Sequence, residues 1–138
     1  MTNMTTHNDL VPDITLSADD HRQLNSLAMA ALERLPDLSD YLLSELERAQ
    51  IVDDTAVPAD IVRMGSSVRY RTDAGQEQQV TLVYPVDADI AAGRISVMTP
   101  VGTALIGLRV GQSITWRDRA DKRQMLTVLS VTPEIVAG

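Results

Sequence analysis

The sequence predicts an α+β fold: an N-terminal short antiparallel helical hairpin and a C-terminal antiparallel sheet with one short helix. Apolar residues recur every three or four positions between residues 17 and 50, and short β-rich segments replace this pattern after residue 62. Charge changes at the same place: residues 1–56 carry 11 acids and 3 bases, whereas residues 57–138 carry 8 acids and 9 bases. We therefore expect a disordered leader at 1–14, a hairpin arm at 15–52, a linker at 53–62 and a sheet domain at 63–138.

Two helices account for the hairpin. The first is predicted over residues 17–35, where Ser17 followed by Asp20 resembles a capping box and Pro36 interrupts the pattern. The second is predicted to begin after Asp37 and to run to about Gln50. The short break between two apolar stripes is typical of an antiparallel pair of helices.

Five strands are predicted in the C-terminal part, over residues 68–71, 78–84, 95–97, 113–117 and 125–131. Asp73-Ala74-Gly75 forms the turn of a hairpin between the first two strands. A short helix follows the third strand, because Thr99 suits an N-cap, Pro100 a first helical position and Gly107 a C-terminal stop.

Composition restricts the function. The chain has no cysteine, which excludes disulfides and thiolate metal sites, and no apolar run approaches the ~20 residues of a membrane span. The N-terminus lacks the pattern of a secretion signal, so we expect a cytoplasmic protein without a membrane partner. Nine basic residues in the C-terminal part alternate with acids and have few aromatic neighbours, so this pattern indicates at most weak nucleic-acid or DNA binding without sequence specificity.

Catalytic signatures are mostly absent from the sequence. It has no phosphate-binding loop, and His7 and His21 have no partners in a catalytic or metal-ligand pattern. Asp37 and Asp40, at the expected hairpin tip, could hold a divalent cation. The favoured interpretation is that Asp37 caps the second helix and that Asp40 lies in its first turn. We therefore predict no enzyme, no cofactor and no metal.

The stretch Arg94–Ile114 (RISVMTPVGTALIGLRVGQSI) resembles the C-terminal domain of the Gre transcript-cleavage factors, the GreA/GreB transcription elongation factor family. Thr81–Pro85 and residues 97–111 resemble a shortened branch of that family, the Rnk regulators of nucleoside diphosphate kinase, and Leu46–Gln50 fits it too. The resemblance implies an FKBP-like domain, an N-terminal coiled coil and docking at the rim of the secondary channel of RNA polymerase. By this resemblance alone, the docking segment comprises Ser96, Thr99, Pro100, Ala104, Leu105 and Gly107.

In the Gre factors an acidic pair at the arm tip helps to hold the catalytic Mg²⁺, and Asp37 and Asp40 fall at the equivalent place. The arm of those factors is much longer, however, and a carboxylate must lie about 2.1 Å from Mg²⁺ to ligate it. We therefore expect a polymerase-binding regulator that competes with cleavage factors without stimulating cleavage, and whose effect on the kinase is indirect. Cleavage stimulation through Asp37 and Asp40, proline isomerisation and a general protein-interaction module remain alternatives. The oligomeric state is open, with a monomer favoured.

Overall fold

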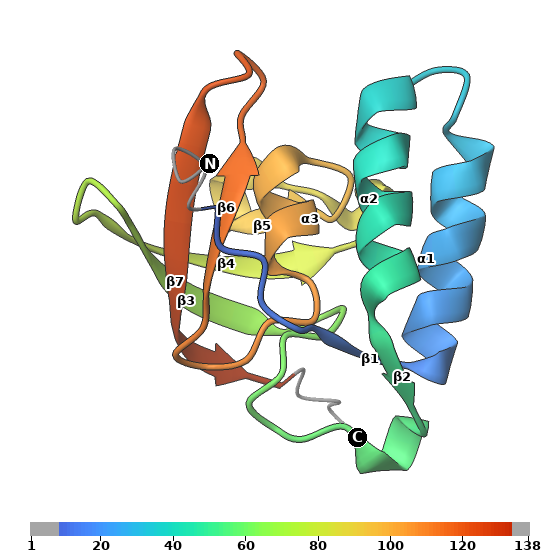
Figure 1. The fold of residues 1–138 in the computed structure, drawn as a ribbon, viewed down its shortest axis with the longest axis horizontal. Coiled ribbons are helices and arrows are strands. Elements are labelled where there is room, and N and C mark those ends of the chain that lie inside the picture. The colour runs from blue at the N-terminus through green and yellow to red at the C-terminus, as the bar shows by residue number, and fades with distance from the viewer. Residues whose placement is uncertain (1–8, 134–138) are drawn as a thin grey trace, which may run out of the picture.

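The computed structural model describes residues 9–133 and has two parts, a helical hairpin and a curled sheet that holds a short helix (Figure 1). The hairpin consists of α1 (Ala18–Ala30) and α2 (Pro36–Arg48), and the short helix is α3 (Pro100–Leu105). Helix α2 lies between α1 and the sheet domain, facing α3. The predicted α+β fold is confirmed.

The sheet has five strands in the order β5-β4-β3-β7-β6. Their bounds are β3 Ser67–Thr72, β4 Glu77–Val83, β5 Arg94–Ser96, β6 Ser113–Arg117 and β7 Arg123–Thr132. All five predicted strands are present. The expectation of a purely antiparallel sheet is wrong in one place, because β5 pairs parallel with β4. The connection between these two strands contains the 3-10 turns η3 (Pro85–Asp87) and η4 (Ile90–Ala92), after which Arg94 lies opposite Thr81 in the second half of β4.

The helix ends of the hairpin differ in part from the prediction. Ser17 caps α1 as expected, since its hydroxyl accepts a hydrogen bond from the backbone N–H of Asp20 at 3.0 Å. Helix α1 ends at Ala30, and α2 already begins at Pro36, with Leu35 at its N-cap and no side-chain cap. Asp37 therefore lies in the first turn and is not the cap. Proline at the first helical position explains this start, because its fixed φ suits a helix and its missing N–H needs no partner there.

Two short strands that the sequence pattern did not predict close the base of the hairpin. Strand β1 (Thr15–Ser17) pairs parallel with β2 (Gln50–Val52), so that Leu16 lies opposite Ile51. Between β2 and the sheet, the predicted linker begins with the 3-10 turn η2 (Asp54–Ala56) and ends at Ile61 and Val62, which are both buried.

The hairpin and the sheet domain share one hydrophobic core. Leu24, Leu42 and Leu46 of the hairpin are at most 2% exposed and belong to the same buried cluster as Leu105 and Leu126 of the domain. Burying each such side chain contributes about 1.5–3 kcal/mol, so these contacts hold the hairpin against the domain. It is therefore packed against the domain and does not project from it as a free arm.

Residues 9–14 are also part of this packing, in contrast to the predicted leader. The N–H of Leu10 donates to the Thr115 hydroxyl at 2.9 Å, and Ile14 is 1% exposed. The remainder of the predicted leader, residues 1–8, lies outside the described residues. Among the helices of residues 9–133, none combines the length and the apolar character that crossing a membrane requires.

Candidate docking surface and hairpin tip

The predicted docking segment forms a tight turn between β5 and α3. The Thr99 hydroxyl accepts from the N–H of Gly102 at 3.1 Å and donates to the Ser96 carbonyl at 2.7 Å. The Ser96 hydroxyl in turn accepts from the N–H of Met98 at 2.9 Å. Thr99 is thus the N-cap and Pro100 the first helical residue, as predicted. These bonds fix the angle at which α3 leaves the sheet.

Gly102 makes this turn possible, and the sequence analysis did not single it out. A Cβ at this position would lie 2.3 Å from the Ser96 carbonyl oxygen and 2.8 Å from the Thr99 hydroxyl. Both distances are far below ordinary contact, so the first turn of α3 fits against β5 only without a side chain at residue 102.

Burial divides the six predicted docking residues into two groups. Ala104 and Leu105 are fully buried and pack in the core, and Gly107 lies at the junction with β1, where its carbonyl accepts from the N–H of Thr15 at 3.1 Å. The other three, Ser96, Thr99 and Pro100, are partly exposed. Only this second group reaches the surface, so a partner could contact these three directly.

An apolar groove of about 580 Å³ adjoins the exposed part of the segment. We define the apolar groove by the residues that line it, Ala88, Ile90, Arg94, Ile95, Ser96, Thr99, Pro100, Val101, Trp116, Asp118, Arg119 and Ala120. Ile90 is 86% exposed, and Val86 on the preceding turn is 89% exposed. Two large aliphatic side chains displayed beside an apolar groove are typical of a protein-interaction surface.

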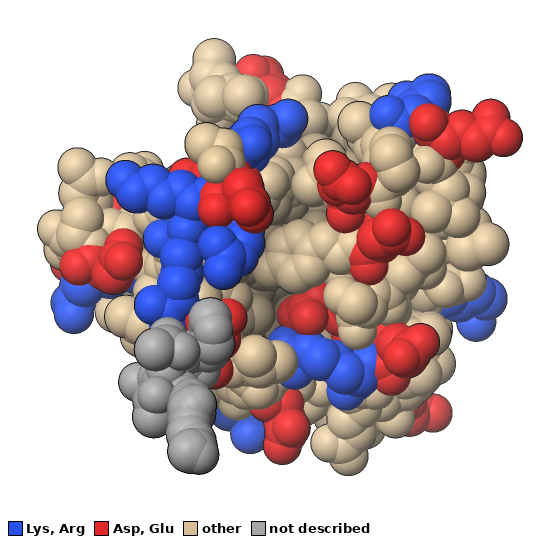
Figure 2. Space-filling model, turned by 45° about the horizontal axis from the view of Figure 1, so that its top comes forward, with Lys and Arg blue, Asp and Glu red and all other residues tan. Residues whose placement is uncertain are grey.

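The hairpin tip lies on the other side of Trp116 and Pro100. A cleft of about 890 Å³, here named the tip cleft, separates residues 34–41 of the tip from the end of β6 and the β6–β7 turn. Figure 2 shows this hollow, with acidic side chains on the hairpin side and a cluster of basic ones on the sheet side. Asp37 and Asp40 are exposed on the tip. Within residues 9–133, no three histidine or acidic side chains are grouped to hold a metal ion.

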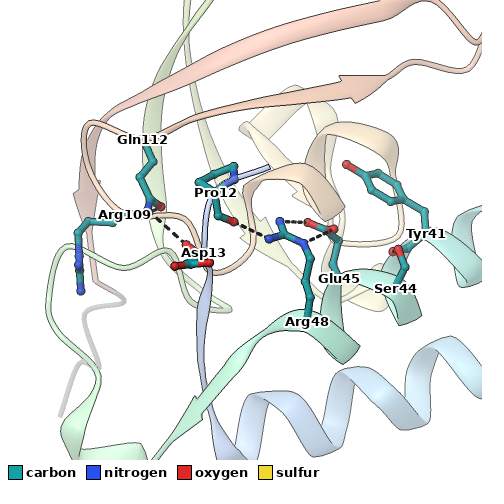
Figure 3. A network of polar contacts seen from close by, with 8 residues as sticks. All are labelled: Pro12, Asp13, Tyr41, Ser44, Glu45, Arg48, Arg109 and Gln112. Atoms are coloured by element: carbon teal, nitrogen blue, oxygen red, sulfur yellow. Dashed lines mark hydrogen bonds and ion pairs between the residues drawn. The ribbon is translucent and has the colours of Figure 1, made fainter. Parts of the chain in front are cut away.

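An ion pair holds the opposite end of α2. Arg48 donates from Nε and Nη2 to the two carboxylate oxygens of Glu45, at 2.8 Å each, and from Nη1 to the carbonyl of Pro12 (Figure 3). Glu45 is 6% exposed, and its hydrogen bonds raise the pKa of Arg48. The Arg48 guanidinium, held in place by Glu45, thus joins the helix to the N-terminal segment.

A second buried carboxylate joins α1 to the sheet domain. Asp20 accepts a long hydrogen bond of 3.4 Å from the N–H of Met64 and lies 3.8 Å from the Arg63 guanidinium. Burial raises the pKa of Asp20 above its usual value, an effect larger than the opposing influence of Met64 and Arg63. Asp20 therefore does not bond back to Ser17 as a capping box requires, and serves the contact between the two parts instead.

The comparisons with known proteins match both parts of the molecule. Residues 57–133 match the family described as "Transcription elongation factor, GreA/GreB, C-term", and residues 12–52 match "Rnk N-terminus". The first match covers β3 to β7, the docking segment and the apolar groove. The chain belongs to the GreA/GreB transcription elongation factor family. The resemblance seen in residues 94–114 is thus confirmed.

Individual relatives of this chain support the same family membership. The regulator of nucleoside diphosphate kinase of Escherichia coli is 45% identical over 91 residues, which are 65% of this chain. The matched part spans 66% of that protein, slightly less than two thirds of its length. Transcription elongation factor GreA of Rhodospirillum rubrum is 36% identical over 74% of this chain and 62% of its own. A solved structure, the prokaryotic transcription elongation factor GreA/GreB from Nitrosomonas europaea, superposes with a TM-score of 0.69 at 36% identity, covering 88% of this chain and 99% of that one.

Proposed function

We propose that this chain is a non-catalytic transcription regulator that binds RNA polymerase at the rim of its secondary channel. The observation that carries this proposal is the apolar groove. It lies within the part of the chain that matches the elongation-factor family, and the exposed members of the docking segment line it. A displayed isoleucine beside a preformed groove is the type of surface on which a few side chains dominate the binding energy.

The charge distribution favours binding with the hairpin directed towards the channel. Residues 1–56, which contain the hairpin, carry a net charge of −8, and residues 57–138 carry +1. An acidic hairpin is attracted to a basic channel mouth and repelled by free nucleic acid. Polymerase binding should therefore weaken as salt is raised, because exposed charges are screened.

The geometry of the hairpin supports binding without cleavage. Each helix has 13 residues, which corresponds to about 20 Å. The tip also shares a cleft with Trp116 and the β6–β7 turn of the same chain, so Asp37 does not extend far beyond the domain. A carboxylate must approach Mg²⁺ to about 2.1 Å to act on it. A domain docked at the rim would leave this tip in the channel entrance, where it excludes longer factors.

Capture of purified core polymerase by the immobilised chain tests the proposal. We expect binding at low salt and at least tenfold weaker binding for Ile90→Asp, because a charge would enter the apolar groove. Ile51→Asp is the matched control, since Ile51 is also an exposed isoleucine, 50% exposed on β2 and outside the groove. Equal loss in both variants, or no capture of the unaltered chain, would contradict the proposal.

Stimulation of cleavage through Asp37 and Asp40 is the second candidate, because both carboxylates are exposed at the tip. Cleavage of the transcript in a backtracked complex, measured with this chain as the only added factor, distinguishes the two. Stimulation that is lost in Asp37→Ala would replace the non-catalytic proposal.

A further inference from the structure

The tip cleft contains two of the four aromatic residues of the whole chain. Tyr41 and Trp116 line it, together with the apolar side chains of Leu35, Leu38 and Pro100. Its volume of about 890 Å³ falls in the range of pockets that enclose a small organic ligand. Flat aromatic and aliphatic walls of this kind favour a ligand with a planar ring system.

Both aromatic side chains carry a polar atom that lacks a partner. The Tyr41 hydroxyl and the Trp116 indole N–H are buried and make no hydrogen bond with any described residue. Buried donors nearly always have an acceptor in folded proteins, and burial raises the pKa of Tyr41, so its hydroxyl stays protonated. Both atoms have almost no accessible surface, so an acceptor on a ligand would reach them only after the side chains that cover them move.

Some charged side chains around the cleft have partners within the protein, and others do not. Asp118 accepts hydrogen bonds from the backbone N–H groups of Ala120 and Lys122 and holds its own turn, and Asp121 lies beside Arg117. In contrast, Arg34 and Arg119 form no ion pair within residues 9–133. Guanidinium groups without a carboxylate partner are ready to bind phosphate.

We propose that the tip cleft binds a ribonucleoside 5′-phosphate, with its base against Trp116 and its phosphate oxygens at Arg119 and Arg34. Asp37 is the one acid of the lining that forms no ion pair or side-chain hydrogen bond within residues 9–133, and its carboxylate can accept from a ribose hydroxyl, which is a donor. The binding site is built from the hairpin tip and the β6–β7 turn together. A bound nucleotide would therefore link these two elements and lie directly beside the apolar groove, with which the cleft shares Pro100, Trp116, Asp118 and Arg119.

Trp116 is the only tryptophan, so the fluorescence of the full chain reports on the cleft. We expect ADP to change this fluorescence saturably and to give the same dissociation constant by calorimetry. Adenosine and inorganic phosphate, each lacking half of the ligand, should bind at least tenfold more weakly. Arg119→Gln should weaken ADP binding about tenfold, which is the loss of one charge-assisted hydrogen bond.

Arg94→Gln is the matched control, because Arg94 is also unpaired among residues 9–133 but lines only the apolar groove. It should leave ADP affinity unchanged. The proposal is overturned by the absence of saturable binding, by equal binding of adenosine or phosphate, by equal effects of Arg119→Gln and Arg94→Gln, or by binding of a single-stranded oligonucleotide in place of ADP. None of these results bears on the capture of polymerase, so the two proposals fail separately.

Discussion

Replacing Gly102 by alanine tests the account of the docking segment most strictly. The new methyl group would lie 2.3 Å from the Ser96 carbonyl oxygen and 2.9 Å from the Val97 Cα, both backbone atoms that cannot rotate away. The turn must open by about 1 Å, which loses the Thr99 cap at about 1 kcal/mol and strains the packing by about 1–3 kcal/mol. We expect the free energy of unfolding to fall by about 2–4 kcal/mol.

Urea unfolding followed by circular dichroism measures this loss. Gly75→Ala provides the comparison, because Gly75 has a φ of +86° in the β3–β4 turn but no atom within 4 Å of an added Cβ. Its cost is conformational and should be about 1–2 kcal/mol. A Gly102→Ala protein within about 0.5 kcal/mol of the unaltered chain would refute the reasoning, because surface changes without a structural role fall in that range.

The two buried carboxylates give further predictions. Glu45→Gln removes the charged partner of Arg48 and should lower the free energy of unfolding by about 1–3 kcal/mol. The control Glu47→Gln, at an exposed position of the same helix, should change the free energy of unfolding by less than about 0.5 kcal/mol. Equal effects of the two substitutions would contradict a stabilising role for the Glu45–Arg48 pair. Because the pKa of Asp20 is raised in the folded state, its folded form binds a proton more tightly than its unfolded form, and its ionisation destabilises the fold. The stability of the unaltered chain should therefore fall relative to Asp20→Asn as pH rises from 3.8, the usual pKa, through the raised value. A difference in stability between the two proteins that stays constant with pH would contradict ionisation of Asp20 as the cause.

Local features of the sequence predicted local features of the structure. The caps at Ser17 and Thr99 and the left-handed Gly107 follow from the chemistry of the few residues around them, and all three are present. Asp37 was assigned wrongly for the same reason: two residues, Pro36 and Asp37, were each suited to a helix start, and the proline occupies the first helical position. The pattern alone does not decide between neighbouring candidates.

Contacts between distant residues could not be predicted from the pattern. The parallel pairs β1–β2 and β4–β5 depend on where the chain returns, and the hydrogen bond from Arg48 to the Pro12 carbonyl spans 36 positions. The burial of Ala104 and Leu105 has a similar origin, because α2 packs on α3. Apolar stripes indicate that a face is buried, but the partner of that face is set by the tertiary fold.

Cleavage of a backtracked transcript by RNA polymerase with GreA present, measured as this chain is added, tests the central claim most directly. If the chain occupies the rim and its tip carboxylates stay out of reach of the catalytic Mg²⁺, it displaces GreA without replacing its activity. The cleavage rate should then fall towards the rate without any factor as the chain saturates the polymerase. A rate that rises, or that stays unchanged at concentrations where the chain is captured with polymerase, would contradict the account.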